Sequence, residues 1–170
     1  MLFTAATASV AQTRELAAAV AELARPGDLV LLVGDLGAGK TAFTQGFGAA
    51  LDITEPITSP TFTLVRQYQG RLELNHLDVY RLEQVEEVLD LGLAEMLDEG
   101  GVTLIEWGDT IIPVLPADFL EVRLRLGEGD DDRVVEIQPV GPRWSARVRA
   151  ITTALAPWIG DTPEMPEVRL

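Results

Sequence analysis

The chain contains no cysteine, and this absence excludes disulfide bonds, thiolate nucleophiles and thiolate metal sites. We therefore expect a protein of a reducing compartment, the cytoplasm. The amino end lacks the basic and apolar regions of a secretory signal, and no apolar run approaches the ~20 residues that cross a bilayer. No association with a membrane is expected.

Basic side chains are scarce, since 13 stand against 27 acidic ones and the formal net charge is −14. This charge repels phosphate backbones, so direct binding of DNA or RNA is disfavoured. Lysine and histidine occur once each, as Lys40 and His76, and every other basic residue is arginine. A single lysine among arginines points to a position where a compact ammonium on a flexible stem is preferred.

The length of 170 residues, with 47% hydrophobic and 24% charged side chains, is typical of one globular domain. Short apolar runs such as residues 28–33 are of the kind that parallel sheets bury on both faces. Strands are predicted at residues 28–33, 62–68, 72–78, 102–105, 119–126 and 134–138, the last two as a hairpin. Helices are predicted at residues 13–25, after a capping box at Ser9 and Gln12, and at 41–51, 83–89, 93–98 and 143–158.

Residues 34–41, Gly-Asp-Leu-Gly-Ala-Gly-Lys-Thr, fit the P-loop pattern G-x-x-x-x-G-K-[ST] between a predicted strand and a predicted helix. The glycines let backbone N–H groups curl into a nest for phosphate oxygens at the positive end of the helix dipole. Lys40 then reaches the β- and γ-phosphates, and the Thr41 hydroxyl is placed to coordinate Mg²⁺. The loop predicts nucleotide binding. Around it we expect an α/β fold, a three-layer P-loop sheet flanked by helices, with a carboxyl-terminal hairpin and helix.

Two acidic residues end predicted strands. Glu106 follows the apolar run 102–105, where P-loop enzymes place a Walker-B carboxylate for Mg²⁺, although the usual residue there is aspartate. The alternative for Glu106 is a carboxylate that faces solvent. Asp78 is suited to orient the attacking water or a metal-bound water, and the alternative is that it caps the next helix.

Other polar and aromatic residues favour structural interpretations. His76 alone builds no metal site, and Trp107 is interpreted as core packing rather than as a cover for a nucleotide. The arginines of the final predicted helix are interpreted as solvated surface rather than as a docking patch; they are Arg143, Arg147 and Arg149.

Two kinds of motif are missing from the sequence, and their absence reduces the number of nucleotide-binding functions to consider. A common GTPase needs a lysine-bearing guanine motif such as N-K-x-D, and the only lysine already belongs to the phosphate loop, so ATP is favoured over GTP. Neither an arginine-rich lid nor an inserted acceptor domain is visible. A small-molecule or nucleotide kinase stays the alternative function, and a nucleotide-sensing module without turnover is a third.

The motif set resembles the TsaE family (older name YjeE), small P-loop ATPases of bacterial tRNA threonylcarbamoyladenosine synthesis. Besides residues 34–41, the resemblance rests on SPTFTLV at 59–65, HLDVYRL at 76–82, LGL at 91–93 and LIEW at 104–107. It implies a subunit that binds ATP and Mg²⁺ and hydrolyses ATP together with the partners TsaD and TsaB. Those partners modify adenosine 37 of tRNA and hold the tRNA, so this chain would meet it only indirectly. Hydrolysis in the family resets the complex between turnovers.

The resemblance also assigns roles to individual residues. Catalytic roles go to Lys40, Asp78 and Glu106, and metal binding goes to Thr41 and Glu106. The nucleotide-binding set is Asp35, Gly37, Ala38, Gly39, Lys40, Thr41 and Ala42 of the loop, with Thr13 of the first helix and Arg133 after the acidic turn. A switch that senses the γ-phosphate is assigned to Ser59, Pro60 and Thr61.

The chain departs from the family at Ala42, where a second hydroxyl residue usually follows the P-loop threonine. The side-chain contact to the α-phosphate is then lost while the backbone N–H remains, so we expect weaker nucleotide binding. We expect residues 1–160 to form a single P-loop ATPase domain. Residues 161–170 carry two prolines and little apolar content, and we expect them to form a flexible tail.

Overall fold

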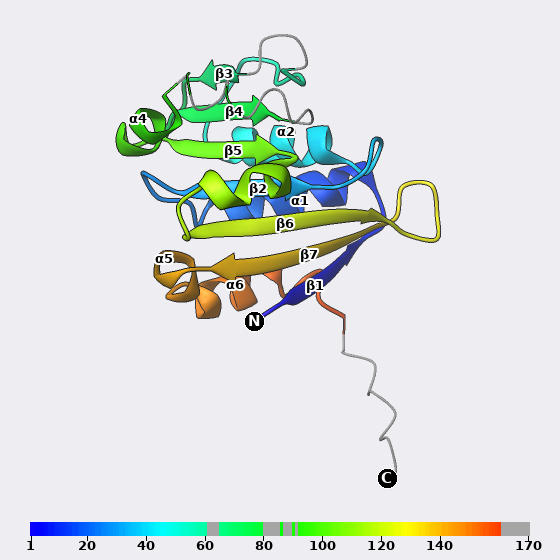
Figure 1. The fold of residues 1–170 in the computed structure, drawn as a ribbon. Coiled ribbons are helices and arrows are strands. Elements are labelled where there is room, and N and C mark those ends of the chain that lie inside the picture. The colour runs from blue at the N-terminus through cyan, green and yellow to red at the C-terminus, as the bar shows by residue number, and fades with distance from the viewer. Residues whose placement is uncertain (61–64, 80–85, 87–89, 91, 161–170) are drawn as a thin grey trace.

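A seven-stranded sheet runs through the part of the chain that the computed structural model describes, namely residues 1–60, 65–79, 86, 90 and 92–160 (Figure 1). Its strands are β1 Phe3–Thr7, β2 Leu29–Val33, β3 Val65–Tyr68, β4 Leu74–Asp78, β5 Val102–Glu106, β6 Phe119–Leu126 and β7 Arg133–Val140. Their order across the sheet is β1-β7-β6-β2-β5-β4-β3. The predicted helix 83–89 and tail 161–170 lie outside the described residues, and the predicted strand 62–68 is described from Val65 onward.

The middle of the sheet is parallel. Strand β2 runs parallel to both β5 and β6, and β4 runs parallel to β5, whereas β7, β1 and β3 are antiparallel to their neighbours. Every residue of β2 is buried, as the continuous apolar run predicts. The carboxyl ends of β2, β4 and β5 therefore meet at one edge of the sheet, where open α/β sheets bind ligands.

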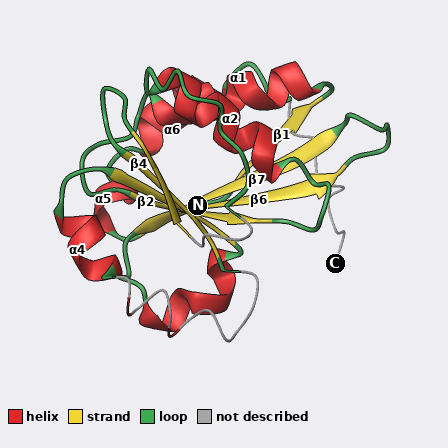
Figure 2. Ribbon diagram, turned by 90° about the horizontal axis from the view of Figure 1, so that it is seen from above, coloured by secondary structure: helices red, strands yellow, loops and turns green. Residues whose placement is uncertain are grey.

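Helices cover both faces of this sheet (Figure 2). One face carries α1 Val10–Ala21, α2 Lys40–Ala50 and α6 Val148–Leu155, and the other carries α4 Leu93–Asp98 and the 3₁₀ helix η1 Gly108–Val114. Successive side chains of β2 pack into two separate hydrophobic cores. Val30 and Leu32 belong to the core on one face of the sheet, and Leu29 and Leu31 belong to the core on the other. The predicted three-layer α/β fold is confirmed. None of the described helices combines the length and apolar character that a membrane span requires.

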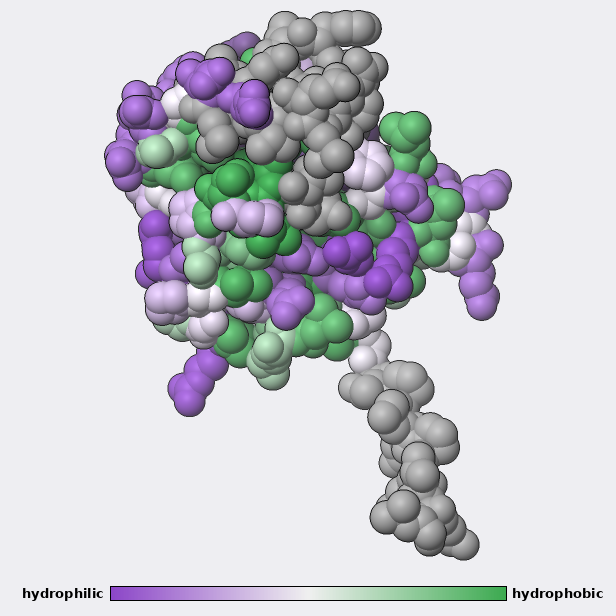
Figure 3. Space-filling model, in the orientation of Figure 1, coloured by the Kyte–Doolittle hydropathy of each residue, from purple (hydrophilic) through white to green (hydrophobic). Residues whose placement is uncertain are grey.

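Strands β6 and β7 show a polar surface on the face turned away from α1 and α6, and hydrophilic side chains gather over them in Figure 3. Two ion pairs lie on these strands, Arg123 with Glu121 at 3.2 Å and Arg125 with Glu136 at 3.1 Å. Alternate side chains of β6, among them Leu120, are buried on the opposite face. The predicted hairpin 119–126 and 134–138 is therefore confirmed, with one polar and one core face.

Helix α1 begins earlier than predicted and follows a strand that the sequence did not suggest. The side chain of Ser9 accepts a hydrogen bond from the Gln12 amide, so the capping box is confirmed, but α1 spans Val10–Ala21 instead of residues 13–25. Strand β1 has mostly small side chains and pairs with β7, at the far side of the sheet. Pairing across more than a hundred residues of sequence leaves no local signal.

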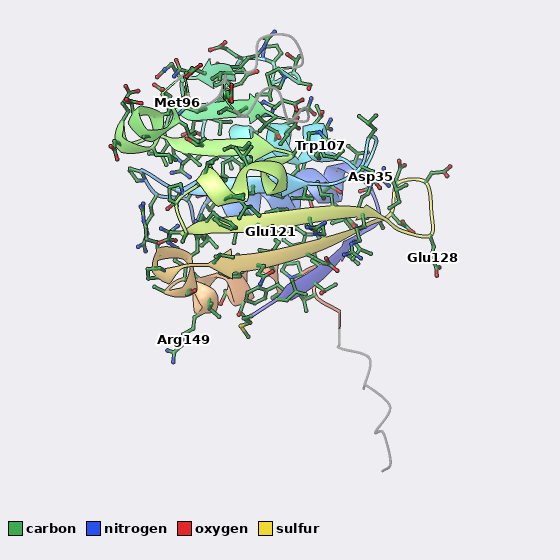
Figure 4. The ribbon with its side chains drawn as sticks, viewed as in Figure 1. Asp35, Met96, Trp107, Glu121, Glu128 and Arg149 are labelled. Atoms are coloured by element: carbon green, nitrogen blue, oxygen red, sulfur yellow. The ribbon has the colours of Figure 1, made fainter. Side chains whose placement is uncertain are left out.

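The carboxyl-terminal helix is divided, and one of its arginines is buried. The structure has α5 Pro142–Ser145 and α6 Val148–Leu155 where one helix over 143–158 was predicted. Between them Arg147 leaves the helical conformation, at φ −100° and ψ 9°, and its guanidinium donates two hydrogen bonds to the buried Asp28 carboxylate. The interpretation of Arg147 as solvated surface is therefore wrong, because a buried carboxylate needs a charged partner. Arg149 does point into solvent (Figure 4).

The position of α2 depends on a close approach to α1. Phe43, Phe47 and Leu51 recur every four residues and are buried, as the spacing predicts. Between the two phenylalanines, Gly46 leaves no room for a side chain, since a Cβ atom there would lie 2.2 Å from the Arg14 carbonyl oxygen. The two helices meet backbone to backbone at this point, and this contact holds the helix that follows the P-loop.

Replacing Gly46 tests how strongly this contact holds α2. Gly46→Ala places a methyl group against the α1 backbone, and we expect the free energy of unfolding to fall by about 1–3 kcal/mol in urea titrations. Gly48→Ala is the matched control, because the nearest atom to its Cβ would be the movable Cδ1 of Ile57. We expect that variant to stay within about 1 kcal/mol of the parent. Equal losses in both variants would contradict this account.

Candidate functional site

A glycine-rich loop connects β2 to α2 at the carboxyl edge of the sheet. Gly37 and Gly39 have φ values of 80° and 103°, the left-handed region that favours glycine. Gly34 passes close to β6, because a Cβ atom there would lie 2.8 Å from the Leu124 carbonyl oxygen. The backbone geometry of the loop thus requires glycine at these three positions, and the loop places the amino end of α2 at this edge.

Lys40 is the first residue of α2, and its side chain folds back over the loop. Its Nζ donates hydrogen bonds to the carbonyl oxygens of Gly34 at 2.5 Å and Asp35 at 3.1 Å. Nζ also lies 4.2 Å from the centre of the Trp107 ring. Burial lowers the pKa of the Lys40 ammonium, while the carboxylates of Glu106, Asp78 and Asp35 oppose that shift. The buried ammonium is therefore stabilised by anions, and a phosphate would add another.

Two carboxylates face this lysine from neighbouring strands. Asp78 ends β4 and Glu106 ends β5, and the two residues are direct partners in the parallel register. Their side chains are buried, with 5% and 3% of their surfaces exposed. The alternative interpretation of Glu106 as a carboxylate facing solvent is therefore wrong. Its Oε1 has no hydrogen-bond partner within the described ranges.

These groups line one cavity of about 620 Å³, a size typical of sites for nucleotide-sized ligands. Its lining consists of Leu36, Gly37, Gly39, Lys40, Thr41, Ser59, Asp78, Glu106 and Trp107. Residues from the loop, from α2 and from the ends of β4 and β5 thus meet in a single space. Asp35 and Ala38 line an adjoining hollow of about 410 Å³, which reaches Arg123 and Arg125 on β6.

Several residues assigned to the site do not line the main cavity. Thr13 is buried in α1, where its hydroxyl lies 2.7 Å from that of Thr7. Arg133 is hydrogen-bonded to the backbone of the loop. Its Nε donates to the Ala38 carbonyl at 3.0 Å, and its Nη2 donates to the Gly37 carbonyl at 3.1 Å. Ala42 and Pro60 are outside the lining as well, and Thr61 lies outside the described residues.

Two lining residues were not expected in the site. Trp107 was interpreted as core packing, yet its ring contacts Lys40 and lines both cavities. Its backbone has φ 61°, an unusual conformation for a residue other than glycine. In Figure 4 Trp107 lies at the same end of the sheet as Asp35 of the loop. Leu36 is 89% exposed at the loop tip, and no pattern in the sequence distinguishes its role.

The arrangement has the chemistry of a polyphosphate site. A lysine ammonium and the free amides of an eleven-residue helix share one cavity with the Thr41 hydroxyl and two carboxylates. No group of three or more His, Cys, Asp or Glu side chains among the described residues could hold a metal ion alone. Mg²⁺ typically binds through one or two carboxylates together with substrate phosphates, so this donor set fits Mg²⁺ bound with a nucleotide.

Comparisons with known proteins agree with this geometry. The family described as "Threonylcarbamoyl adenosine biosynthesis protein TsaE" matches residues 7–135. A Bacillus subtilis (strain 168) protein named tRNA threonylcarbamoyladenosine biosynthesis protein TsaE is 44% identical over 139 residues, covering 81% of this chain and 86% of that protein. A protein of the same name from Nostoc (strain PCC 7120) is 46% identical over 133 residues, covering 75% of this chain and 80% of that protein.

The fold itself is also similar to a solved structure. The crystal structure of Bacillus subtilis YdiB superposes with a TM-score of 0.78 at 36% identity, covering 90% of this chain and 95% of that one. The family match contains the loop, Asp78 and Glu106, and it ends within β7. Sequence, fold and site geometry thus lead to the same assignment, and the chain belongs to the TsaE family of threonylcarbamoyl adenosine biosynthesis proteins.

Proposed function

We propose that this chain binds ATP with Mg²⁺ and hydrolyses it in the formation of threonylcarbamoyladenosine on tRNA, working with TsaD and TsaB. The observation that carries the proposal is the single cavity in which Lys40 and Thr41 face Asp78 and Glu106. The relatives, named as tRNA threonylcarbamoyladenosine biosynthesis proteins, supply the pathway. The net charge of −14 supports a division of labour in which the partners hold the RNA.

Lys40 and the loop amides bind the phosphate tail. Phosphate oxygens at the amino end of α2 meet unpaired N–H groups and the positive end of the helix dipole. The Lys40 ammonium bonds two loop carbonyls, and a short movement of its flexible stem brings it to the γ-phosphate. Arg133 donates hydrogen bonds to the carbonyls of Gly37 and Ala38 and so helps to fix the shape of the loop that binds the ligand.

Thr41 and Glu106 are the residues that would hold Mg²⁺. A hydroxyl oxygen and a carboxylate match the oxygen donors that this cation prefers, and both residues line the cavity. Mg²⁺, when bound, neutralises charge that develops on the β- and γ-phosphates. Asp78, beside Glu106 in the register, orients the attacking water and accepts its proton.

Incubation with ATP labelled at the γ-phosphate tests this function against its alternatives. We expect phosphate release in a mixture with TsaD, TsaB and tRNA, and little release from the chain alone. Lys40→Ala is the control, and it should abolish release because it removes the only lysine ammonium of the chain from the phosphates. Transfer of the label to a small acceptor would instead show a kinase, and no release in either mixture would show a nucleotide sensor.

Replacing Glu106 separates metal binding from nucleotide binding. Glu106→Gln keeps the side-chain volume and removes the charge, so we expect ATP affinity measured in EDTA not to fall, because one repulsion of the phosphates is lost. Hydrolysis in the full mixture should fall by at least about 100-fold, because the carboxylate that holds the cation is lost. Glu121→Gln on β6, outside the cavity, is the matched control and should keep full activity (Figure 4). Full activity in Glu106→Gln would refute its role.

A substitution at Ala42 is expected to strengthen nucleotide binding rather than to weaken it. Ala42→Thr restores a hydroxyl in the first turn of α2, and one new hydrogen bond of about 0.5–1.5 kcal/mol should tighten ADP binding about 2- to 12-fold in calorimetry. Ala49→Thr, exposed near the other end of the same helix, is the control and should leave the affinity unchanged. Nanomolar ADP affinity of the parent chain would contradict the predicted weakening at Ala42.

A further inference from the structure

The only histidine of the chain lies directly behind the carboxylate assigned to the metal. His76 is in the middle of β4, fully buried, and it does not line the cavity. Its Nε2 lies 3.7 Å from Oε1 of Glu106. His76 and Glu106 come from neighbouring strands and face the α2 side of the sheet, together with Leu74 and Leu104.

Three polar atoms of this pair have no hydrogen-bond partner in the described part of the chain. This holds for both ring nitrogens of His76 and for Oε1 of Glu106. The 3.7 Å separation exceeds an N–H···O hydrogen bond by less than about 1 Å. It is also too short for a bridging water, since two hydrogen bonds of about 2.8 Å at a tetrahedral angle span about 4.6 Å. A small side-chain rotation would therefore join the two groups directly.

A packing role alone does not explain this pair. On the opposite face of the same two strands, the buried Asn75 is satisfied, because its side chain accepts from Gln67 at 3.0 Å and donates to Thr103 at 3.5 Å. The sheet thus supplies partners for Asn75 on that face. At His76 it leaves the imidazole facing one carboxylate oxygen, a costly arrangement that calls for a reason.

We propose that His76 is a positioning residue for Glu106, whose Oε1 accepts a hydrogen bond from the His76 Nε2–H when the cavity is occupied. One carboxylate oxygen is then held by the imidazole, and the other is left for the cation. Hydrogen bonds at such sites are often long without substrate and shorten in the complex. Outer groups that orient a metal ligand commonly contribute about 10- to 100-fold in metal affinity. The inference rests on the proposed role of Glu106 as a metal ligand.

Two amide substitutions of similar polarity test this role. The amide nitrogen of glutamine reaches the place of Nε2, whereas that of asparagine reaches only the place of Nδ1. In the complex with ADP, Mn²⁺ binding is measured by the loss of the free-ion electron paramagnetic resonance signal. We expect His76→Asn to weaken Mn²⁺ binding about 10- to 100-fold and His76→Gln to stay within about threefold of the parent. ADP affinity in EDTA should be unchanged in both variants.

The outcomes separate this inference from the proposed function. If Glu106→Gln weakens Mn²⁺ binding but His76→Asn and His76→Gln behave alike, the positioning role is overturned and the proposed function stands. If Glu106→Gln leaves Mn²⁺ binding unchanged, the metal role of Glu106 fails, and the inference fails with it. A loss of ADP affinity in EDTA for His76→Asn would show that the substitution damages the fold of the site, which also overturns a specific role toward the cation.

Discussion

The parallel register of three central strands is the constraint on which the site depends. Glu106 is paired with Leu32 of β2 on one side and with Asp78 of β4 on the other. The P-loop follows the end of β2, and the two carboxylates lie at the ends of β4 and β5. The register of these strands therefore sets the distances between the loop and the carboxylates. A slip of one residue would turn Glu106 and His76 to the opposite face, away from α2. The packing of both cores opposes such a slip, because it would move each buried side chain of the strand into the core on the other face.

Burial makes the charged groups of the site depend on one another. Lys40 is 8% exposed, and desolvation acts against its ammonium, while the carboxylates of Asp78 and Glu106 act in its favour. The same carboxylates repel each other at adjacent strand ends, and the lysine offsets that repulsion. A nucleotide alone would bring its negative phosphates towards these carboxylates. A divalent cation between them removes this conflict, which is why ligand and metal are proposed to bind together.

Local signals made much of the fold predictable. Strand β2, the glycine loop and α2 follow from an apolar run, a motif and a four-residue spacing, and Ser9 caps α1 as its capping box indicates. Strand β1 and the break at Arg147 could not be predicted, because both depend on partners more than a hundred residues away, β7 and Asp28. The same limit applies to Trp107, whose positive φ and contact with Lys40 exist only once the sheet has formed.

The segments outside the family match support the site from its far end. The match covers residues 7–135 and omits α5 and α6, yet Arg147 from this region pairs with Asp28 at the amino end of β2. Strand β2 is thus held at its start by a buried ion pair and at its end by the P-loop. Losing one partner of a buried pair leaves an uncompensated charge, which strongly destabilises a fold. The carboxyl-terminal helices therefore contribute to the position of the P-loop without approaching it, since they hold the strand from which the loop departs.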